Sequence, residues 1–243
     1  MKIRSLPPLL LLAASPLCAW TPETSQLLAR DAVKQLPPAL VGMIGHYPEP
    51  FNAGFSEVKP AAGRAALEAQ LVAAGEQLEA RMLKTGDLAG FARAWGEYLR
   101  LAIEAADPLL EARLSGAARH DYQDYFYRAS GKVKKALYLD AFPDSSDERG
   151  LFILMHTRAD RCQRELAAVY LPDGSRRSAL DFDDRSNVFG LTALAFNHAV
   201  SEAAALLSRR WQRGGGDMTG SPFLPRPVVR ASAPDRGAFQ NRD

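Results

Sequence analysis

The chain has 243 residues, of which 47% are hydrophobic and 24% charged. These values exclude a collagen-like or wholly disordered chain, because both classes have a very different composition. The 30 basic and 28 acidic residues nearly balance, so the net charge gives no argument for nucleic acid or an anionic membrane as partner. Two cysteines are too few for a four-cysteine zinc site.

The first nineteen residues resemble a secretory signal peptide. Lys2 and Arg4 precede a short apolar stretch that ends at the small residue Ala19, and the stretch is too short to span a bilayer. Cleavage after Ala19 would make Trp20 the N-terminus and would remove two basic residues, leaving 28 basic against 28 acidic ones. A lipid anchor on Cys18 is the alternative. In both cases we expect an exported protein, periplasmic or secreted.

The rest of the chain has the pattern of an all-helical protein. Thr21 can cap a first helix that Pro37-Pro38 ends. Prolines and glycine concentrate in residues 46–60, which predicts a long loop. Residues 61–84 lack proline and are rich in alanine, leucine and glutamate, which favours a second helix.

The second half of the chain contains four further predicted helices. Asp87 can cap the first of them, Asp107-Pro108 ends it, and either Asp184 or Ser186 can begin the last. A Pro-Asp-Gly-Ser sequence at 172–175 predicts a turn before the last helix. The four helices are expected at about 88–106, 116–129, 144–170 and 184–213.

These elements divide the chain into three parts. A signal peptide covers residues 1–19 and one compact all-α domain covers residues 20–213. A glycine triplet then ends the last helix, and residues 214–243 contain four prolines among small and polar residues. This composition predicts a disordered tail that contributes nothing to the core.

The histidines are the most informative polar residues, because three of the four have a carboxylate four residues later. On a helix this spacing places both side chains on one face, about 5–6 Å apart. Such a pair can supply two metal ligands, orient a histidine, or consist of two unrelated surface groups. We expect a solvated pair at His156, a mostly buried histidine at His198 and an interior-facing pair at His120. The three pairs are His120 with Asp124, His156 with Asp160 and His198 with Glu202.

The chain resembles the zinc-dependent phospholipase C and single-strand nuclease superfamily, whose members are exported helical phosphodiesterases with three zinc ions. Its N-terminal tryptophan, a zinc ligand through its amine and carbonyl, corresponds to Trp20. Its middle helix reads G-x3-H-x3-D-x3-P-x-H, and Gly96 and Pro108 match the glycine and the proline. The next helix reads H-x3-E, which His120 and Asp124 resemble.

Most of the family's ligands are replaced in this chain. Arg100, Glu104 and Leu110 stand at the histidine, aspartate and last histidine of the middle helix, and Ser25 stands at a histidine of the first. A unit charge 4 Å from a dication costs roughly 8 kcal/mol at an effective dielectric constant of 20. Arg100 therefore opposes a metal ion, and it can pair with Glu104 on the same helix instead.

The resemblance therefore implies no metal, or at most one zinc ion held by Trp20, Glu104, His120 and Asp124. Three functions remain open. The first is a non-catalytic binding or accessory protein with an eroded metal site. The second is a phosphoester hydrolase with a reduced metal site, in which Arg100 binds the substrate phosphate. The third is a helical exported protein that shares only its helix pattern with the family. A phosphoester is the ligand that the resemblance implies, no catalytic residue can be named, and the partner is unknown.

Overall fold

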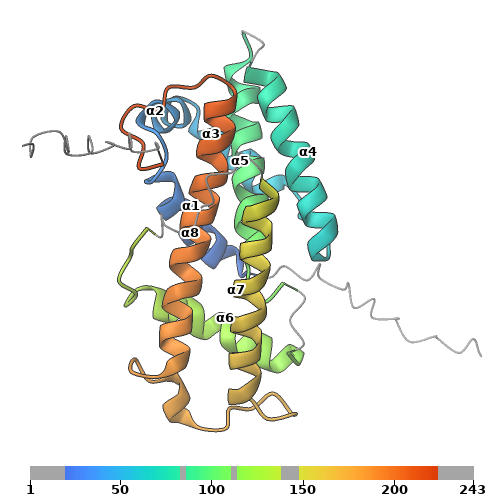
Figure 1. The fold of residues 1–243 in the computed structure, drawn as a ribbon, viewed down its shortest axis with the longest axis vertical. Helices are drawn as coiled ribbons and strands as arrows, with labels where there is room; N and C mark the ends of the chain where they lie inside the picture. The colour runs from blue at the N-terminus through green and yellow to red at the C-terminus, as the bar shows by residue number, and fades with distance from the viewer. Residues whose placement is uncertain (1–19, 83–85, 111–113, 138–147, 224–243) are drawn as a thin grey trace, which may run out of the picture.

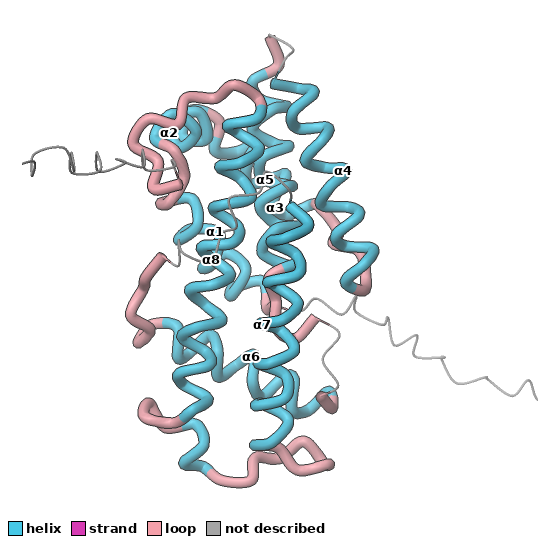
Figure 2. Tube along the Cα trace, viewed as in Figure 1, coloured by secondary structure: helices cyan, strands magenta, loops and turns pink. Residues whose placement is uncertain are grey.

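The computed structural model describes residues 20–82, 86–110, 114–137 and 148–223. The predicted signal peptide and residues 224–243 lie outside these ranges. Within them the chain forms α-helices and one short 3₁₀ helix and contains no β-strand, so the all-α class is confirmed (Figure 2). The elements are α1 (Pro22–Val33), α2 (Pro38–His46), α3 (Pro48–Glu57), α4 (Arg64–Met82), α5 (Leu88–Ala105), α6 (Gly116–Ser130), α7 (Glu148–Val169), η1 (Ala179–Phe182) and α8 (Asn187–Arg213).

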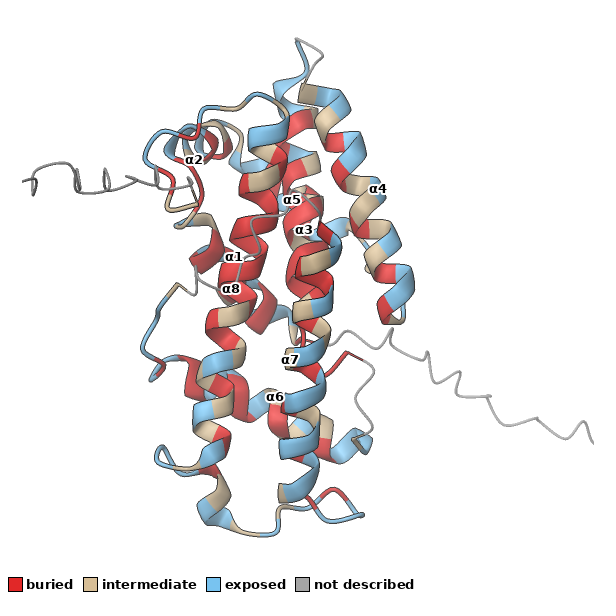
Figure 3. Ribbon diagram, in the orientation of Figure 1, coloured by how far each residue is buried: buried red, intermediate tan, exposed pale blue. Residues whose placement is uncertain are grey.

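Two long helices set the length of the molecule. α7 and α8 run side by side along its long axis (Figure 1), and the 27 residues of α8 span roughly 40 Å at 1.5 Å per residue. α5 packs against α8. Three other helices, α1, α3 and α4, pack against α5, and α6 also contacts α8. Burial is therefore greatest along α5 and the C-terminal half of α8 (Figure 3). No helix in the described ranges has the length and apolar character needed to cross a membrane.

The backbones of α3 and α5 approach each other closely at two glycines. A Cβ atom on Gly54 would lie 2.0 Å from the carbonyl oxygen of Arg93, and one on Gly96 would lie 2.0 Å from that of Phe51. No side chain fits at such distances, so glycine is required at both positions. The glycine at 96, which matches the family pattern, thus has a packing role in this chain.

The region predicted as a long loop, residues 46–60, is mostly helical. Pro38 begins α2 and Pro48 begins α3, with Pro50 also in the first turn of α3. The first turn of a helix has no partner for its backbone N–H groups, so proline is favoured there. The loop prediction is wrong because these prolines begin helices rather than interrupt them.

Three predicted caps locate helix starts correctly, whereas the predicted helix start at residues 144–147 lies outside the described residues. Thr21 accepts a hydrogen bond from the backbone N–H of Thr24 at 3.2 Å, and Asp87 accepts one from Gly90 at 2.8 Å. Ser186, rather than Asp184, caps α8 by accepting from the N–H of residue 189 at 3.2 Å. The hydrogen-bonding capacity of these side chains therefore fixes the ends of the helices.

The first residues of the predicted tail pack against the domain. Met218 is 8% exposed and Phe223 contacts the core. The indole N–H of Trp211 donates to the carbonyl oxygen of Asp217 at 2.9 Å. The expectation that the tail contributes nothing to the core therefore needs correction for residues 217–223.

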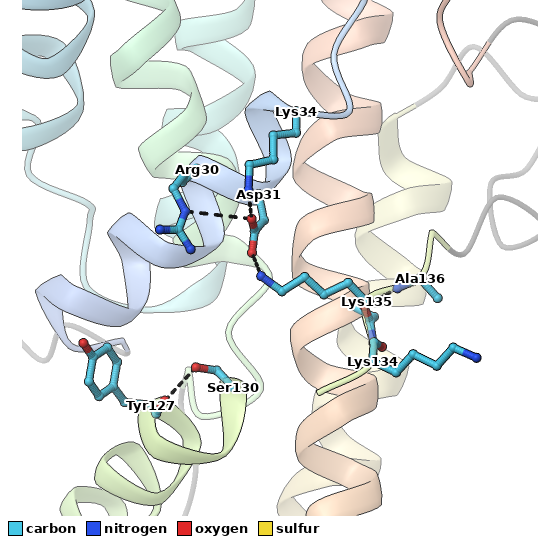
Figure 4. A network of polar contacts seen from close by, with 9 residues as sticks. Arg30, Asp31, Lys34, Tyr127, Ser130, Lys134, Lys135 and Ala136 are labelled. Carbon is cyan, nitrogen blue, oxygen red and sulfur yellow. Dashed lines mark hydrogen bonds and ion pairs between the residues drawn. The ribbon is translucent and has the colours of Figure 1, made fainter. Parts of the chain in front are cut away.

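A buried carboxylate joins α1 to the segment that follows α6 (Figure 4). Asp31 accepts hydrogen bonds from Lys34, at 2.7 Å, and from Lys135. Burial raises the pKa of Asp31, but the two lysines more than offset this effect, so the pKa lies below its usual value. The side-chain amide of Asn197 on α8 fixes the same segment. It donates to the carbonyl oxygen of Lys134 at 3.1 Å and accepts from the backbone N–H of Ala136 at 2.8 Å.

Candidate functional site

Several residues predicted at the metal centre meet in the interior, where α1 contacts α5. Trp20 is 1% exposed, and its indole N–H donates to the carbonyl oxygen of Ile103 at 3.1 Å. Its ring lies 4.6 Å from that of Phe126, centroid to centroid. The hydroxyl of Ser25 donates to Oε1 of Glu104 at 3.0 Å. Trp20 and Ser25 thus both contact α5.

The predicted ion pair between Arg100 and Glu104 is present. Nη2 of Arg100 lies 2.8 Å from Oε1 of Glu104, and the two side chains are 11% and 2% exposed. The guanidinium also lies over the ring of Phe55, 5.5 Å from its centroid. One oxygen of the carboxylate therefore has both a hydroxyl and a guanidinium as donors, and the centre is closed by protein groups.

His120 and Asp124 lie on the outside of the molecule, contrary to the prediction. Their side chains share one face of α6, with Nε2 of His120 3.8 Å from Oδ2 of Asp124, but they are 77% and 57% exposed. The large apolar side chains Tyr122 and Phe126, two residues further on, take the interior face and are fully buried. Hydrophobic burial determines which face of a helix turns inward, and here it favours the aromatic pair.

The four residues proposed as zinc ligands are therefore not brought together. Trp20 and Glu104 are interior, whereas His120 and Asp124 are exposed. In the described part of the chain, no three histidine, cysteine, aspartate or glutamate side chains are placed to share a metal ion. The donor set at the interior centre, a carboxylate already paired with arginine and a serine hydroxyl, does not fit a zinc ion.

The other histidines also differ from simple i,i+4 pairs. His156 contacts Glu68 of α4, so it links two helices rather than pairing with Asp160. His46 is exposed at the end of α2. His198 was expected to be mostly buried and is of intermediate burial. Glu202, one turn further along α8, pairs with Arg158 rather than with His198.

A pocket of about 80 Å³ lies between α7 and α8, beside the C-terminal end of α5. A single water needs roughly 10–15 Å³, so the pocket has room for a small organic molecule. Gln163 fixes one wall by donating to the carbonyl oxygens of Pro108, at 3.1 Å, and Leu110, at 3.3 Å. The lining is mostly apolar: Ala106, Pro108, Met155, Ala159, Cys162, Leu191, Leu194 and Ala195, together with Arg158, Arg161, His198 and Glu202.

The charged groups of this pocket are unusual because one carboxyl is almost completely buried. Glu202 is 2% exposed, and the guanidinium of Arg158, 22% exposed, contacts its Oε1. Burial raises the pKa of Glu202 to about 7, although Arg158 lowers it. Burial and the charge of Arg158 lower the pKa of His198 to about 4. At neutral pH the pocket thus contains a charged arginine, a partly protonated carboxyl and a neutral imidazole.

Cys162 contributes to the floor of the pocket but is not a nucleophile. Burial raises the pKa of its thiol to about 12, so it stays protonated at neutral pH. A mostly apolar pocket with a few convergent polar groups is typical of a small-molecule binding site, and the described residues here suit binding better than covalent catalysis.

The pair between Arg158 and Glu202 was missed from the sequence, since the spacing between His198 and Glu202 suggested a different partner. One signal was present: Glu202 is the only charged residue in the stretch from Ala199 to Leu207, where every other residue except Ser201 is apolar. A carboxylate in such a stretch is almost never buried without a partner. The partner itself lies 44 residues away on α7, which local spacing does not reveal.

Comparisons with known proteins add no relative to these observations. A scan against protein-family models finds no match, and searches of curated proteins and of solved structures find none either.

Proposed function

We propose that the protein is an exported binding or accessory protein with a phospholipase C-like helical fold, and that it is not a hydrolase. The observation that carries this proposal is the closed centre formed by Ser25, Arg100 and Glu104. Each of these residues stands at a position where the family has a metal ligand. In this chain they satisfy one another through a hydrogen bond of 3.0 Å and an ion pair of 2.8 Å.

The charge of Arg100 argues against a hydrolase with a metal ion at this centre and against one in which Arg100 binds the substrate phosphate. Arginine keeps its proton at any physiological pH, so it repels a metal ion at this position by several kcal/mol. If Arg100 instead bound a substrate phosphate, it would have to leave Glu104. A 2% exposed carboxylate would then lose its cation, which costs roughly 3–5 kcal/mol in buried pairs.

Metal analysis and a phosphodiesterase assay test this proposal. We expect less than one zinc ion per purified chain and no zinc-dependent cleavage of bis(p-nitrophenyl) phosphate, because the donor set does not fit zinc. Two or three zinc ions per chain together with cleavage would contradict the proposal and favour the hydrolase.

The structural role of the closed centre can be measured separately. Arg100→Ala leaves Glu104 buried without its cation, so we expect a loss of roughly 3–5 kcal/mol in the free energy of unfolding. Arg93→Ala is the matched control on the same helix, because Arg93 pairs with Glu57 and Glu97 at the surface. The control should unfold close to the wild type. Equal, small effects of both substitutions would show that the Arg100 pair is not a structural element.

A further inference from the structure

The pocket between α7 and α8 combines an apolar wall with a cation, Arg158, that is paired with one carboxyl group among the described residues. Leu191, Leu194 and Ala195 line it from α8, and Leu194 is 38% exposed. Arg158 lines it from α7 and contacts Glu202, the only carboxyl group among the described residues of the lining. A guanidinium binds carboxylates through two parallel N–H donors, and the apolar wall suits a hydrocarbon chain.

We propose that this pocket binds a short aliphatic monocarboxylate, with its carboxylate group on Arg158 and its hydrocarbon chain along the apolar wall of α8. The proposal rests on the proposed function only in that the protein binds a ligand rather than hydrolysing one. The ligand class follows from the size of the pocket, about 80 Å³, and from its charges.

Glu202 makes the binding dependent on pH. When it is ionised, it occupies Arg158 and repels a second carboxylate. When it is protonated, it can donate a hydrogen bond to the ligand, and Arg158 becomes available. The pKa of Glu202 lies at about 7 because of burial, so the protonated fraction falls from about 0.9 at pH 6 to about 0.1 at pH 8. If only this form binds, the affinity falls about tenfold over the same range.

The other charged groups near Glu202 do not change this expectation. Arg161, on α7, keeps its positive charge throughout and favours an anion. His198, on α8, has a pKa of about 4 and therefore stays neutral between pH 6 and pH 8. Among the described residues that follow α5, Ala106 and Pro108 line the pocket, and neither carries a charge.

Titration of the processed chain with butyrate tests the proposal. Binding is monitored through the amide chemical shifts of the protein, in a buffer that contains a metal chelator. We expect shifts in the residues that line the pocket, and a dissociation constant about tenfold lower at pH 6 than at pH 8. Butylamine and n-butanol are the matched probes, with similar chains and no negative charge, and both should bind at least tenfold more weakly than butyrate at pH 6. The chelator keeps this test independent of the zinc analysis.

Two variants separate the roles of the charged groups. Glu202→Gln keeps the shape and the donor of the protonated acid, so butyrate should bind equally at pH 6 and pH 8, with the affinity of the wild type at pH 6. Arg158→Gln leaves Glu202 unpaired and can unfold the chain, so the double variant Arg158→Gln/Glu202→Gln is used. It removes both charges and should bind butyrate at least tenfold more weakly at either pH.

Three results would overturn the proposal. Tighter binding of butylamine than of butyrate would show that Glu202, not Arg158, anchors the ligand. Equal binding of butanol and butyrate would show that the charges play no part. Butyrate binding that the double variant retains would place the ligand elsewhere on the protein.

Discussion

Glu202 and His198 should affect the stability of the protein in opposite directions as the pH changes. Both lie on α8, one turn apart, and burial disfavours the charged form of each. Burial raises the pKa of the acid to about 7 from an ordinary 4.5, and lowers that of the imidazole to about 4 from an ordinary 6.5. Stability rises with pH wherever the unfolded chain binds more protons than the folded one, and falls in the opposite case.

The sign for each residue follows from this rule. Between pH 4.5 and pH 7 the folded chain keeps a proton on Glu202 that the unfolded chain has lost, so stability falls as the pH rises. The difference of about 2.5 pH units corresponds to roughly 3 kcal/mol. Between pH 4 and pH 6.5 the unfolded chain binds a proton on His198 that the folded chain does not, so stability rises. His198 is partly exposed, and solvent reduces its effect to roughly 2 kcal/mol.

The two effects largely cancel in the wild type, and single substitutions should separate them. Glu202→Gln removes the loss at high pH, so its free energy of unfolding relative to the wild type should rise by roughly 3 kcal/mol from pH 4.5 to pH 8. His198→Gln should fall relative to the wild type by roughly 2 kcal/mol from pH 4 to pH 7. Urea denaturation at half-unit pH intervals measures both curves.

Parallel curves for Glu202→Gln and the wild type would refute this reasoning. That result would mean that the attraction of Arg158 balances the cost of burial, so that the pKa of Glu202 is the same in the folded and the unfolded chain. The pH dependence expected for carboxylate binding would then fail as well. A curve that falls relative to the wild type as the pH rises would be a stronger contradiction, because it requires a lowered pKa.

Three further predictions concern single residues. Met218→Ala should lower the free energy of unfolding by about 2 kcal/mol, because it removes a buried side chain that packs the segment after α8; a change below about 0.5 kcal/mol in urea denaturation would mean that this segment is not part of the core. His120→Ala should leave the melting temperature and the metal content unchanged, because His120 and Asp124 are solvent-exposed; a loss of bound zinc in elemental analysis would contradict this. Mass spectrometry of the protein purified from its natural source should find Trp20 at the N-terminus, and an intact leader or a lipid on Cys18 would contradict the predicted signal peptide.

Most of the helices, though not α2 and α3, could be predicted from the sequence because their ends depend on local chemistry. Thr21, Asp87 and Ser186 each bond a backbone N–H group within three residues, so the signal and its effect lie in the same short segment. The ion pair between Arg100 and Glu104 was predictable for the same reason, since both residues lie one turn apart on α5. Short-range spacing is enough wherever both partners belong to one helix.

The orientation of α6 was predicted wrongly although its sequence contains the information. The buried positions of α6 include Ala118, Tyr122, Phe126 and Ala129, which repeat with helical spacing. His120 and Asp124 repeat with the same spacing on a different face, and the prediction gave the polar pair more weight than the apolar one. Burial of two aromatic rings stabilises the fold by several kcal/mol, so it outweighs any preference of an exposed pair.

Partners on different helices were not predictable from spacing. Arg158 pairs with Glu202 across 44 residues and His156 with Glu68 across 88. The sequence offered His198 as a nearer partner for Glu202 and Asp160 as a nearer partner for His156. The packing of α7 against α8 and the position of α7 relative to α4 bring the observed pairs together. The candidate pocket depends on the first of these pairs, which is why its position emerges only from the structure.

Two buried ion pairs differ in a way that separates a structural role from a binding role. Glu104 and Glu202 are each 2% exposed and each contact an arginine. Arg100 and Glu104 lie on one helix, so their distance is fixed by α5 itself, and Ser25 adds a second donor to the same carboxylate oxygen. Arg158 and Glu202 lie on two helices, and the lining of the pocket includes both of them. A ligand between α7 and α8 can therefore compete for Arg158, whereas Arg100 is held by its own helix. This difference is why the closed centre suits a role in stability and the pocket suits a role in binding.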